Sequence, residues 1–225
     1  MKICIDAGHN NSGWDTGASG FGLREQDISF DIAKCLKENL EALGFDVILT
    51  RNKREENIGK NLSESINRRV KIANSQNADL FVSIHANAGG GMGTETYVYC
   101  KGSAAEKYAK EVQKSIVKKL NTADRGVKER KNLGVLKYTK MPAILVETAF
   151  IDNKEDNLIL RNAKGFGKAI SDGIYSAASP DIIDVLAKKI EINDIEGAKA
   201  ALKKAKEENS SLYWILYKLV MGGVV

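Results

Sequence analysis

Cysteine is scarce in this chain and poorly placed for cross-linking. The 225 residues include three cysteines, Cys4, Cys35 and Cys100, which fall in separate predicted elements and form no CxxC pair. An odd number of cysteines at such spacings argues against a disulfide scaffold, so we expect buried free thiols. A chain of this length with 43% hydrophobic residues can bury its own core without such cross-links.

Long apolar runs are absent as well. No segment approaches the roughly 18 consecutive apolar residues of a membrane-spanning helix. The first residues, MKICIDAGHN, run directly into a predicted strand without the apolar stretch of a signal peptide. We therefore expect a chain that is made in the cytoplasm without a signal peptide and does not insert into a membrane.

Charge of one sign is only slightly in excess. Lys and Arg number 34 against 29 Asp and Glu, which gives a net charge of +5. This excess is too small for a nucleic-acid-binding arm, and we expect no nucleic-acid partner. It would still help a protein that works near an anionic polymer.

Short apolar runs alternate along the chain with amphipathic helical patterns. Strands are predicted at 2–6, 46–51, 79–85, 94–99, 134–138 and 143–148. Helices are predicted from about Ile28 to a stop at Gly44, near 62–76, from Ser103 to Leu120, and near 154–177. This succession predicts an α/β fold with a twisted, mostly parallel or mixed sheet and helices on both of its faces.

Proline is rarer still, and one of the two prolines marks a boundary. Pro180 ends the last predicted helix of the first part, so we predict one domain over residues 1–178. Residues 181–225 read only as short helices and form a predicted small all-helical C-terminal domain. Such a short segment makes a marginal core, so we expect it to dock on the first domain, form a homodimer through its helices, or both.

The two histidines of the chain both stand at the ends of predicted strands. His9 follows the first strand, and His85 closes the third. Glu147 lies near the end of the strand at 143–148, and Glu25 precedes the first helix. Because ligands of open α/β sheets bind beyond the carboxyl ends of the strands, these four side chains are candidates for one site.

Two histidines and a carboxylate form a known catalytic zinc set, with water in the fourth position. A second carboxylate can take the proton of that water. His9, Glu25 and His85 are therefore candidate Zn²⁺ ligands, and Glu147 is the candidate general base. Because no compact HExxH motif is present, the alternative of hydrogen-bonded structural histidines stays open on spacing alone.

A series of longer motifs resembles the zinc-dependent N-acetylmuramoyl-L-alanine amidases of the Amidase_3 type over roughly residues 1–177. The matching segments include IDAGHN, GASGFGLREQDISFDIAKCL, LSESINRRVKIAN, ADLFVSIHANA, DRGVK and VLKYTKMPAILVETAFIDN. The resemblance implies that His9, Glu25 and His85 bind zinc and that Glu147 is catalytic. It also implies hydrolysis of the amide between N-acetylmuramic acid and L-alanine in peptidoglycan, causing lysis of the cell wall.

The loop after His9 departs from the family pattern. Asn10 and Asn11 stand where the family usually has two glycines, and Asp15 comes about two residues late. Trp14 in this loop either stacks on a sugar or covers the edge of the core. Asp6 either orients His9 or closes the first strand.

Two residues further along the chain carry a similar choice. Asn87 and Arg125, in HANA and DRG, either touch substrate or fix loops.

An amidase of this kind without a leader fits a phage or prophage endolysin that reaches the wall after release by a holin. A cellular autolysin or a sporulation amidase with the same chemistry is the alternative, as is a non-catalytic peptidoglycan-binding module. Residues 181–225 would then serve wall binding or oligomerisation. A nucleotide site is a poor fit, because GASGFGLRE lacks a clean GxGxxG directly after the strand.

Overall fold

The computed structural model describes residues 1–178 together with Gly197, Ala200 and Lys203. The chain divides into two compact units, residues 1–177 and 178–225. The predicted helical domain at 181–225, and the predicted dimer contact through its helices, lie outside the described residues. Among the residues that are described, no helix is both long and apolar enough to cross a membrane.

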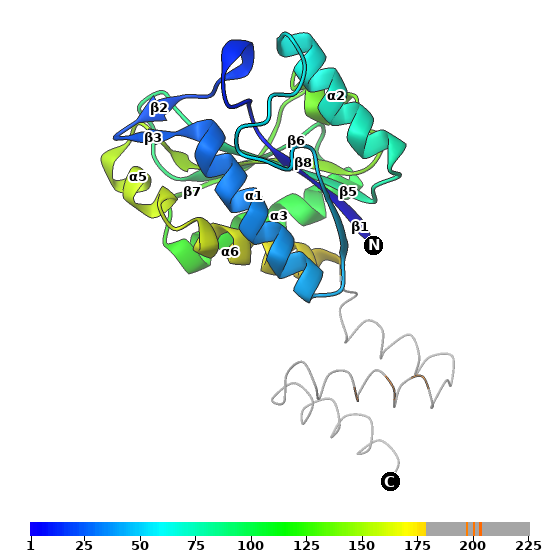
Figure 1. Ribbon diagram of the computed structural model, residues 1–225. Coiled ribbons are helices and arrows are strands. Elements are labelled where there is room, and N and C mark those ends of the chain that lie inside the picture. The colour runs from blue at the N-terminus through cyan, green and yellow to red at the C-terminus, as the bar shows by residue number, and fades with distance from the viewer. Residues whose placement is uncertain (179–196, 198–199, 201–202, 204–225) are drawn as a thin grey trace. The chain divides into compact units, whose positions relative to one another are not determined.

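A six-stranded sheet forms the centre of the first unit, in the order β4-β1-β5-β8-β6-β7 (Figure 1). Its strands are β1 (Lys2–Ala7), β4 (Asp46–Leu49), β5 (Leu80–Asn87), β6 (Thr94–Val98), β7 (Asp124–Glu129) and β8 (Ala143–Phe150). Strands β4, β1, β5 and β8 are parallel, β6 runs antiparallel to β8, and β7 is parallel to β6. The predicted mixed sheet of an α/β fold is confirmed.

Three long helices cover one face of this sheet. They are α1 (Glu25–Ala42), α3 (Ala104–Leu120) and α6 (Ala163–Ala178). Helix α6 packs closely on the other two because glycines line its contacts. An added Cβ at Gly167 would come within 2.7 Å of Cys35 Cβ, and one at Gly173 within 2.5 Å of Val112 Cα. The sequence positions these glycines where the helices touch.

The opposite face is covered by α2 (Leu62–Ser75), which lies across the sheet from α3 and α6 (Figure 1), and by the short helix α4 (Gly134–Lys137). The buried cluster on this side joins strands and helices. It contains Cys4, Phe81, Tyr97 and Leu145 from the strands, Ala73 from α2, and Val135 and Leu136 from α4. Cys4 is a buried free thiol, as predicted, and Cys35 and Cys100 are free and partly buried.

Smaller elements complete the first unit. They are the 3-10 turn Gly13–Asp15, the two-residue strands β2 (Ser19–Gly20) and β3 (Leu23–Arg24), and the helix α5 (Lys154–Leu160). Strands β2 and β3 pair antiparallel in the segment that leads from His9 to α1.

Two predicted elements differ from the structure, and one strand of the main sheet is absent from the prediction. The strand predicted at 134–138 is helix α4, because a short apolar run does not distinguish a strand from a buried helical turn. The helix predicted at 154–177 is two helices, interrupted where the Asn162 side chain accepts a hydrogen bond from the Gly165 N–H at 2.9 Å. Strand β7 was not predicted, because it is a charged, largely exposed edge strand.

Strand register determines which side chains stand at the uncovered end of the sheet face on which α2 and α4 pack. Leu145 pairs with Ser83 on one side and with Tyr97 on the other, and this row lies under the helices. Two residues further on, Glu147 pairs with His85 and Glu95. Since side chains two residues apart point to the same face, this second row stands at the rim of the sheet.

Candidate active site

His9 sits in a tight turn directly after β1. Its backbone has a φ of 62°, in the left-handed region that few residues other than glycine adopt. The preceding residue must be a glycine, since an added Cβ on Gly8 would lie 2.5 Å from Cε1 of His85. The sequence Ala-Gly-His therefore ends the strand and lets the two imidazole rings approach each other.

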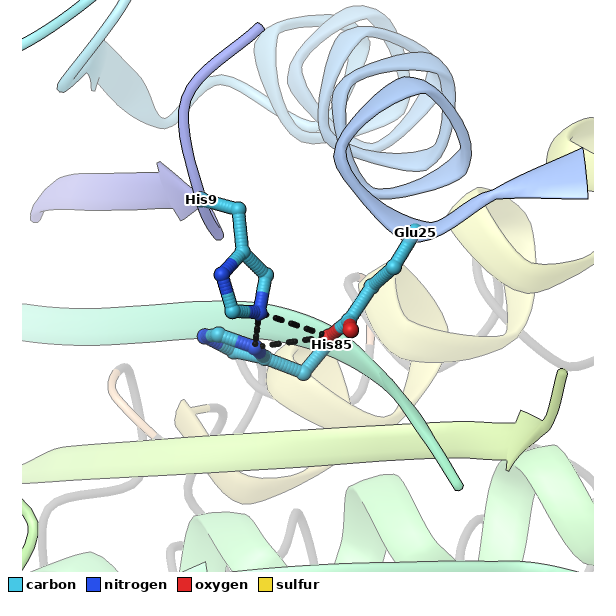
Figure 2. A group of neighbouring side chains, drawn as sticks. All are labelled: His9, Glu25 and His85. Carbon is cyan, nitrogen blue, oxygen red and sulfur yellow. Dashed lines mark hydrogen bonds and ion pairs between the residues drawn. The ribbon is translucent and has the colours of Figure 1, made fainter. Parts of the chain in front are cut away.

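The ligand atoms of His9, Glu25 and His85 converge on one point, although they come from the loop after β1, the start of α1, and β5 (Figure 2). Nε2 of His9 lies 3.0 Å from Oε1 of Glu25, and Nδ1 of His85 lies 3.0 Å from the same oxygen. The two ring nitrogens are 3.1 Å apart. All three ligand atoms lie within 4.8 Å of one another, so this group could hold a metal ion.

Glu25 is the first residue of α1 and is buried. Its Oε2 accepts a hydrogen bond from the Ala18 N–H at 2.9 Å, and its Oε1 accepts one from the Ala86 N–H at 3.1 Å. Burial opposes the charged form, but hydrogen bonds and charge from the two histidines hold the pKa of Glu25 far below its usual range. Glu25 is therefore a carboxylate at neutral pH, as a metal ligand must be.

The other ring nitrogen of His9 faces Asp15. Oδ1 of Asp15 lies 3.2 Å from Nδ1 of His9, and the Ser65 hydroxyl donates to Oδ2 of Asp15 at 2.5 Å. Burial favours the neutral form of His9, but Asp15 and Glu25 raise its pKa to about 9. Asp15 is thus the residue that orients the ring so that Nε2 points to the other candidate ligands.

Asp6 does not contact the His9 side chain. Instead it accepts hydrogen bonds from the Arg69 Nη1 at 2.6 Å and from the hydroxyls of Thr50 and Ser83 at 2.6 and 2.7 Å. Arg69 in turn donates to the carbonyl oxygens of Ala7 and His9. The buried Asp6–Arg69 pair therefore supports the backbone of the turn that carries His9.

Asn10, at which the loop departs from the family pattern, has a structural role. Its side chain is buried and bridges to Ile58, accepting from the Ile58 N–H at 2.8 Å and donating to the Ile58 carbonyl at 3.0 Å. This pairing ties the site loop to the segment before α2, which glycine could not do. Trp14 does not cover the core edge, because it is 83% exposed.

Glu147 lies beside His85 on the neighbouring strand, in register with it. Its Oε2 is buried and, among the described residues, has no hydrogen-bond partner. Burial, with a contribution from the charges of Glu25 and Glu95, raises the pKa of Glu147 to about 7, although the histidines act in the opposite direction. A carboxyl group with such a pKa can accept and return a proton near neutral pH.

Glu95 is a second acidic side chain at the rim, and the sequence alone does not indicate a role for it. Glu95 pairs in register with Glu147 from the other side. Burial opposes the charged form of Glu95, but Lys128, Tyr97 and Arg125 hold its pKa at about 2. Neither Glu95 nor Asp15 stands in a spacing that points to the site, so only the register and the loop conformation reveal them.

Comparison with known proteins places the chain in a family. Residues 3–177 match the N-acetylmuramoyl-L-alanine amidase family, which is most of the chain. The chain belongs to this family. The resemblance seen in the motifs is therefore confirmed, while the roles of His9, Glu25, His85 and Glu147 stay predictions.

Individual relatives of the amidase family are similar over different lengths. The N-acetylmuramoyl-L-alanine amidase LytC of Bacillus subtilis is 41% identical over 182 residues, covering 77% of this chain and 35% of LytC. The endolysin of Bacillus phage SPP1 is 32% identical over 225 residues, covering 96% of this chain and 76% of the endolysin. The structure of the amidase AmiC2 of Nostoc punctiforme has a TM-score of 0.68 at 33% identity, covering 78% of this chain and 96% of AmiC2.

The chain spans only part of some of these amidases. It covers 35% of the length of LytC and 65% of CwlM, an amidase of Bacillus licheniformis. Family membership therefore applies to the domain described above.

Proposed function

We propose that this chain is a zinc-dependent amidase that hydrolyses the bond between N-acetylmuramic acid and L-alanine in peptidoglycan. The proposal rests on one observation above all. A buried carboxyl oxygen of Glu147, which has no hydrogen-bond partner among the described residues, stands beside His85, which converges with His9 and Glu25. The match of residues 3–177 to the N-acetylmuramoyl-L-alanine amidase family supports the choice of substrate.

The three converging side chains suit a zinc ion. Two imidazole nitrogens and one carboxylate oxygen are the donors of a catalytic zinc site that keeps one position open. Imidazole donors argue against Mg²⁺ or Ca²⁺, which prefer oxygen ligands. Asp15 behind His9 supplies the carboxylate that such histidine ligands commonly have on their other ring nitrogen.

A zinc ion held there would polarise the scissile carbonyl and lower the pKa of the attacking water. Glu147 takes the proton of that water and passes it to the leaving nitrogen of L-alanine. Burial raises the pKa of Glu147 above that of an ordinary carboxyl group, which favours a group that can both accept and return a proton.

Digestion of purified peptidoglycan tests this reaction. We expect new free amines of L-alanine and no new reducing sugars, and we expect a chelator to stop the release until zinc is added back. New reducing ends without new amines would identify a glycosidase and contradict the proposal. A non-catalytic wall-binding module would sediment with the wall and release neither product.

We further propose that the chain acts as an endolysin of a phage or prophage. The similarity to the SPP1 endolysin over 96% of this chain supports this setting. A cellular autolysin or sporulation amidase is the second candidate, supported by the 41% identity with LytC. Bacteria that express an endolysin stay intact until a holin or another agent permeabilises the membrane. Lysis without permeabilisation would favour the autolysin.

Residues 181–225 are proposed as a wall-binding or oligomerisation module. Analytical ultracentrifugation of the full chain separates the two roles. A dimer that dissociates when these residues are altered supports oligomerisation. A monomer whose sedimentation with the wall depends on them supports wall binding.

A further inference from the structure

The rim of the sheet carries a second polar centre next to Glu147. The row that begins with His85 and Glu147 continues to Glu95 on β6, since these residues pair in register. From the neighbouring edge strand β7, Arg125 and Lys128 reach the same carboxylate. The cluster of Glu95, Arg125 and Lys128 therefore extends the candidate active site across two more strands.

Glu95 is 2% exposed, and both of its oxygens are occupied. Its Oε1 accepts from the Asn87 amide at 2.9 Å and from the Tyr97 hydroxyl. Its Oε2 accepts from Nε of Arg125 at 2.7 Å and from Nζ of Lys128. The buried carboxylate thus holds two cationic side chains in fixed positions, and Asn87 holds the carboxylate.

The two cations are not neutralised by this arrangement. One carboxylate faces two positive charges, which leaves a net charge of +1 on the cluster. The side chains of Arg125 and Lys128 remain 36% and 41% exposed, so the excess charge faces solvent. A structural ion pair would need only one of these cations.

Arg125 is also oriented by contacts beyond Glu95. Its guanidinium lies over the ring of Phe150, 4.9 Å from the centroid. Within the part of the chain that the structure describes, its further hydrogen bond is a long one, 3.4 Å from Nη1 to the Met92 carbonyl. A guanidinium has five N–H donors, so donors remain for a ligand. Their planar fork matches a carboxylate.

The spacing of the strands relates this cluster to the reaction. From Glu147 on β8 to β7 there are two strand spacings, about 10 Å in total. An extended peptide covers about 10 Å in three residues. A stem peptide whose first amide lies at Glu147 and which runs across the strands toward β7 would therefore bring its second or third residue over Arg125 and Lys128.

We propose that Arg125 and Lys128 form a binding site for a carboxylate of the stem peptide, on its second or third residue. This inference rests on the proposed amidase function. In the intact substrate the lactyl carboxyl of muramic acid is part of the scissile amide, so the charged group must come from the peptide. Glu95 and Asn87 are positioning residues, because they act through the two cations.

Two forms of one wall test this site. Peptidoglycan is freed of phosphate-containing polymers, and half is treated with a carbodiimide and excess ammonium to convert carboxylates into amides. We expect kcat/KM of the unaltered chain to be lower by about tenfold or more on the amidated wall, mostly because KM rises. The two walls differ only in the charge of their carboxyl groups. Equal kcat/KM on both walls would overturn the proposal.

Variants localise the effect. The variants Arg125→Met and Lys128→Met should have a lower kcat/KM than the unaltered chain on the untreated wall. On the amidated wall their kcat/KM should equal that of the unaltered chain. Lys131→Met, which removes the same charge from an exposed lysine paired with Glu129, should change neither value. An equal loss on both walls would assign Arg125 and Lys128 a structural role. The comparison of walls with the unaltered chain needs no variant to fold.

A binding measurement separates this proposal from the amidase function. Sedimentation of Glu147→Gln with the two walls measures binding at the cluster of Glu95, Arg125 and Lys128 without hydrolysis of the wall. If the unaltered chain releases no amines but binding still depends on carboxylates and on Arg125, the reaction is wrong and the site stands. If amines are released and binding ignores carboxylates, the reaction stands and the site is wrong.

Discussion

The carboxylate of Asp15 lies 3.2 Å from Nδ1 of His9, on the side of the ring opposite Glu25 and His85. A partner of this kind fixes both the tautomer and the direction of a histidine ligand. Removing such partners commonly lowers metal affinity by about 10- to 100-fold. Asp15 therefore matters to the proposed zinc site without touching the ion.

Asp15→Ala should weaken zinc binding by about 10- to 100-fold, because His9 loses the group that aims Nε2. Competition with a chromophoric chelator measures this affinity. Asp27→Ala is the matched control, since that carboxylate binds Arg24 on the surface of α1. Zinc affinity that is the same in both variants would show that Asp15 does not orient the ligand.

Arg69→Met should strongly destabilise the fold. Arg69 and Asp6 form an ion pair of 2.6 Å with side chains 3% and 1% exposed, so the change leaves a buried carboxylate unpaired. Loss of one partner of such a pair costs about 3–5 kcal/mol. Urea unfolding measures the free energy of unfolding. Arg68→Ala, on the same helix but 54% exposed, should change it by less than about 0.5 kcal/mol.

Glu95 makes stability depend on pH in the acid range. Its pKa is lowered to about 2 in the folded protein, against an ordinary value of 4.5. The stabilisation is therefore present above pH 4.5 and is lost as the pH falls toward 2. The unaltered chain should be more stable than Glu95→Gln at pH 7, and the difference should shrink steadily below pH 4.5. A difference that is constant with pH would contradict the ion-pair account.

Trp14→Ala should weaken binding to the glycan strand. Trp14 is 83% exposed, and it adjoins Asp15, which contacts His9. An indole in that position can stack on a sugar ring, so we expect KM for peptidoglycan to rise while kcat changes little. Tyr138→Ala removes another exposed aromatic residue, from the region of α4, and should leave KM unchanged. Equal KM values for both variants would rule out this contact.

The sequence predicts the sheet and the four candidate site residues for a simple physical reason. Apolar runs must lie inside, and their polar ends must emerge at a rim, so His9, His85 and Glu147 are visible without a structure. Glu25 is visible too, because it precedes the first helix and helix starts lie near the same rim, and the family motifs select the same four residues. The scarcity of histidine removes competing choices.

The remaining parts of the site depend on relationships that spacing does not encode. Asp15 reaches His9 only because the loop between them turns back, with the backbone of His9 in the left-handed region. The role of Glu95 depends on the register of β6, and Arg125 and Lys128 come from β7, which has too little apolar character to be predicted. The four residues of helix α4 carry too little pattern to distinguish a helix from a strand.

Glu147→Gln tests the central claim most directly. The variant keeps the size of the side chain but cannot accept the proton, so it should bind one zinc per chain and release L-alanine amines at least about 100-fold more slowly. Glu129→Gln, on the exposed edge strand, should match the unaltered chain. Undiminished amine release by zinc-loaded Glu147→Gln would contradict the account.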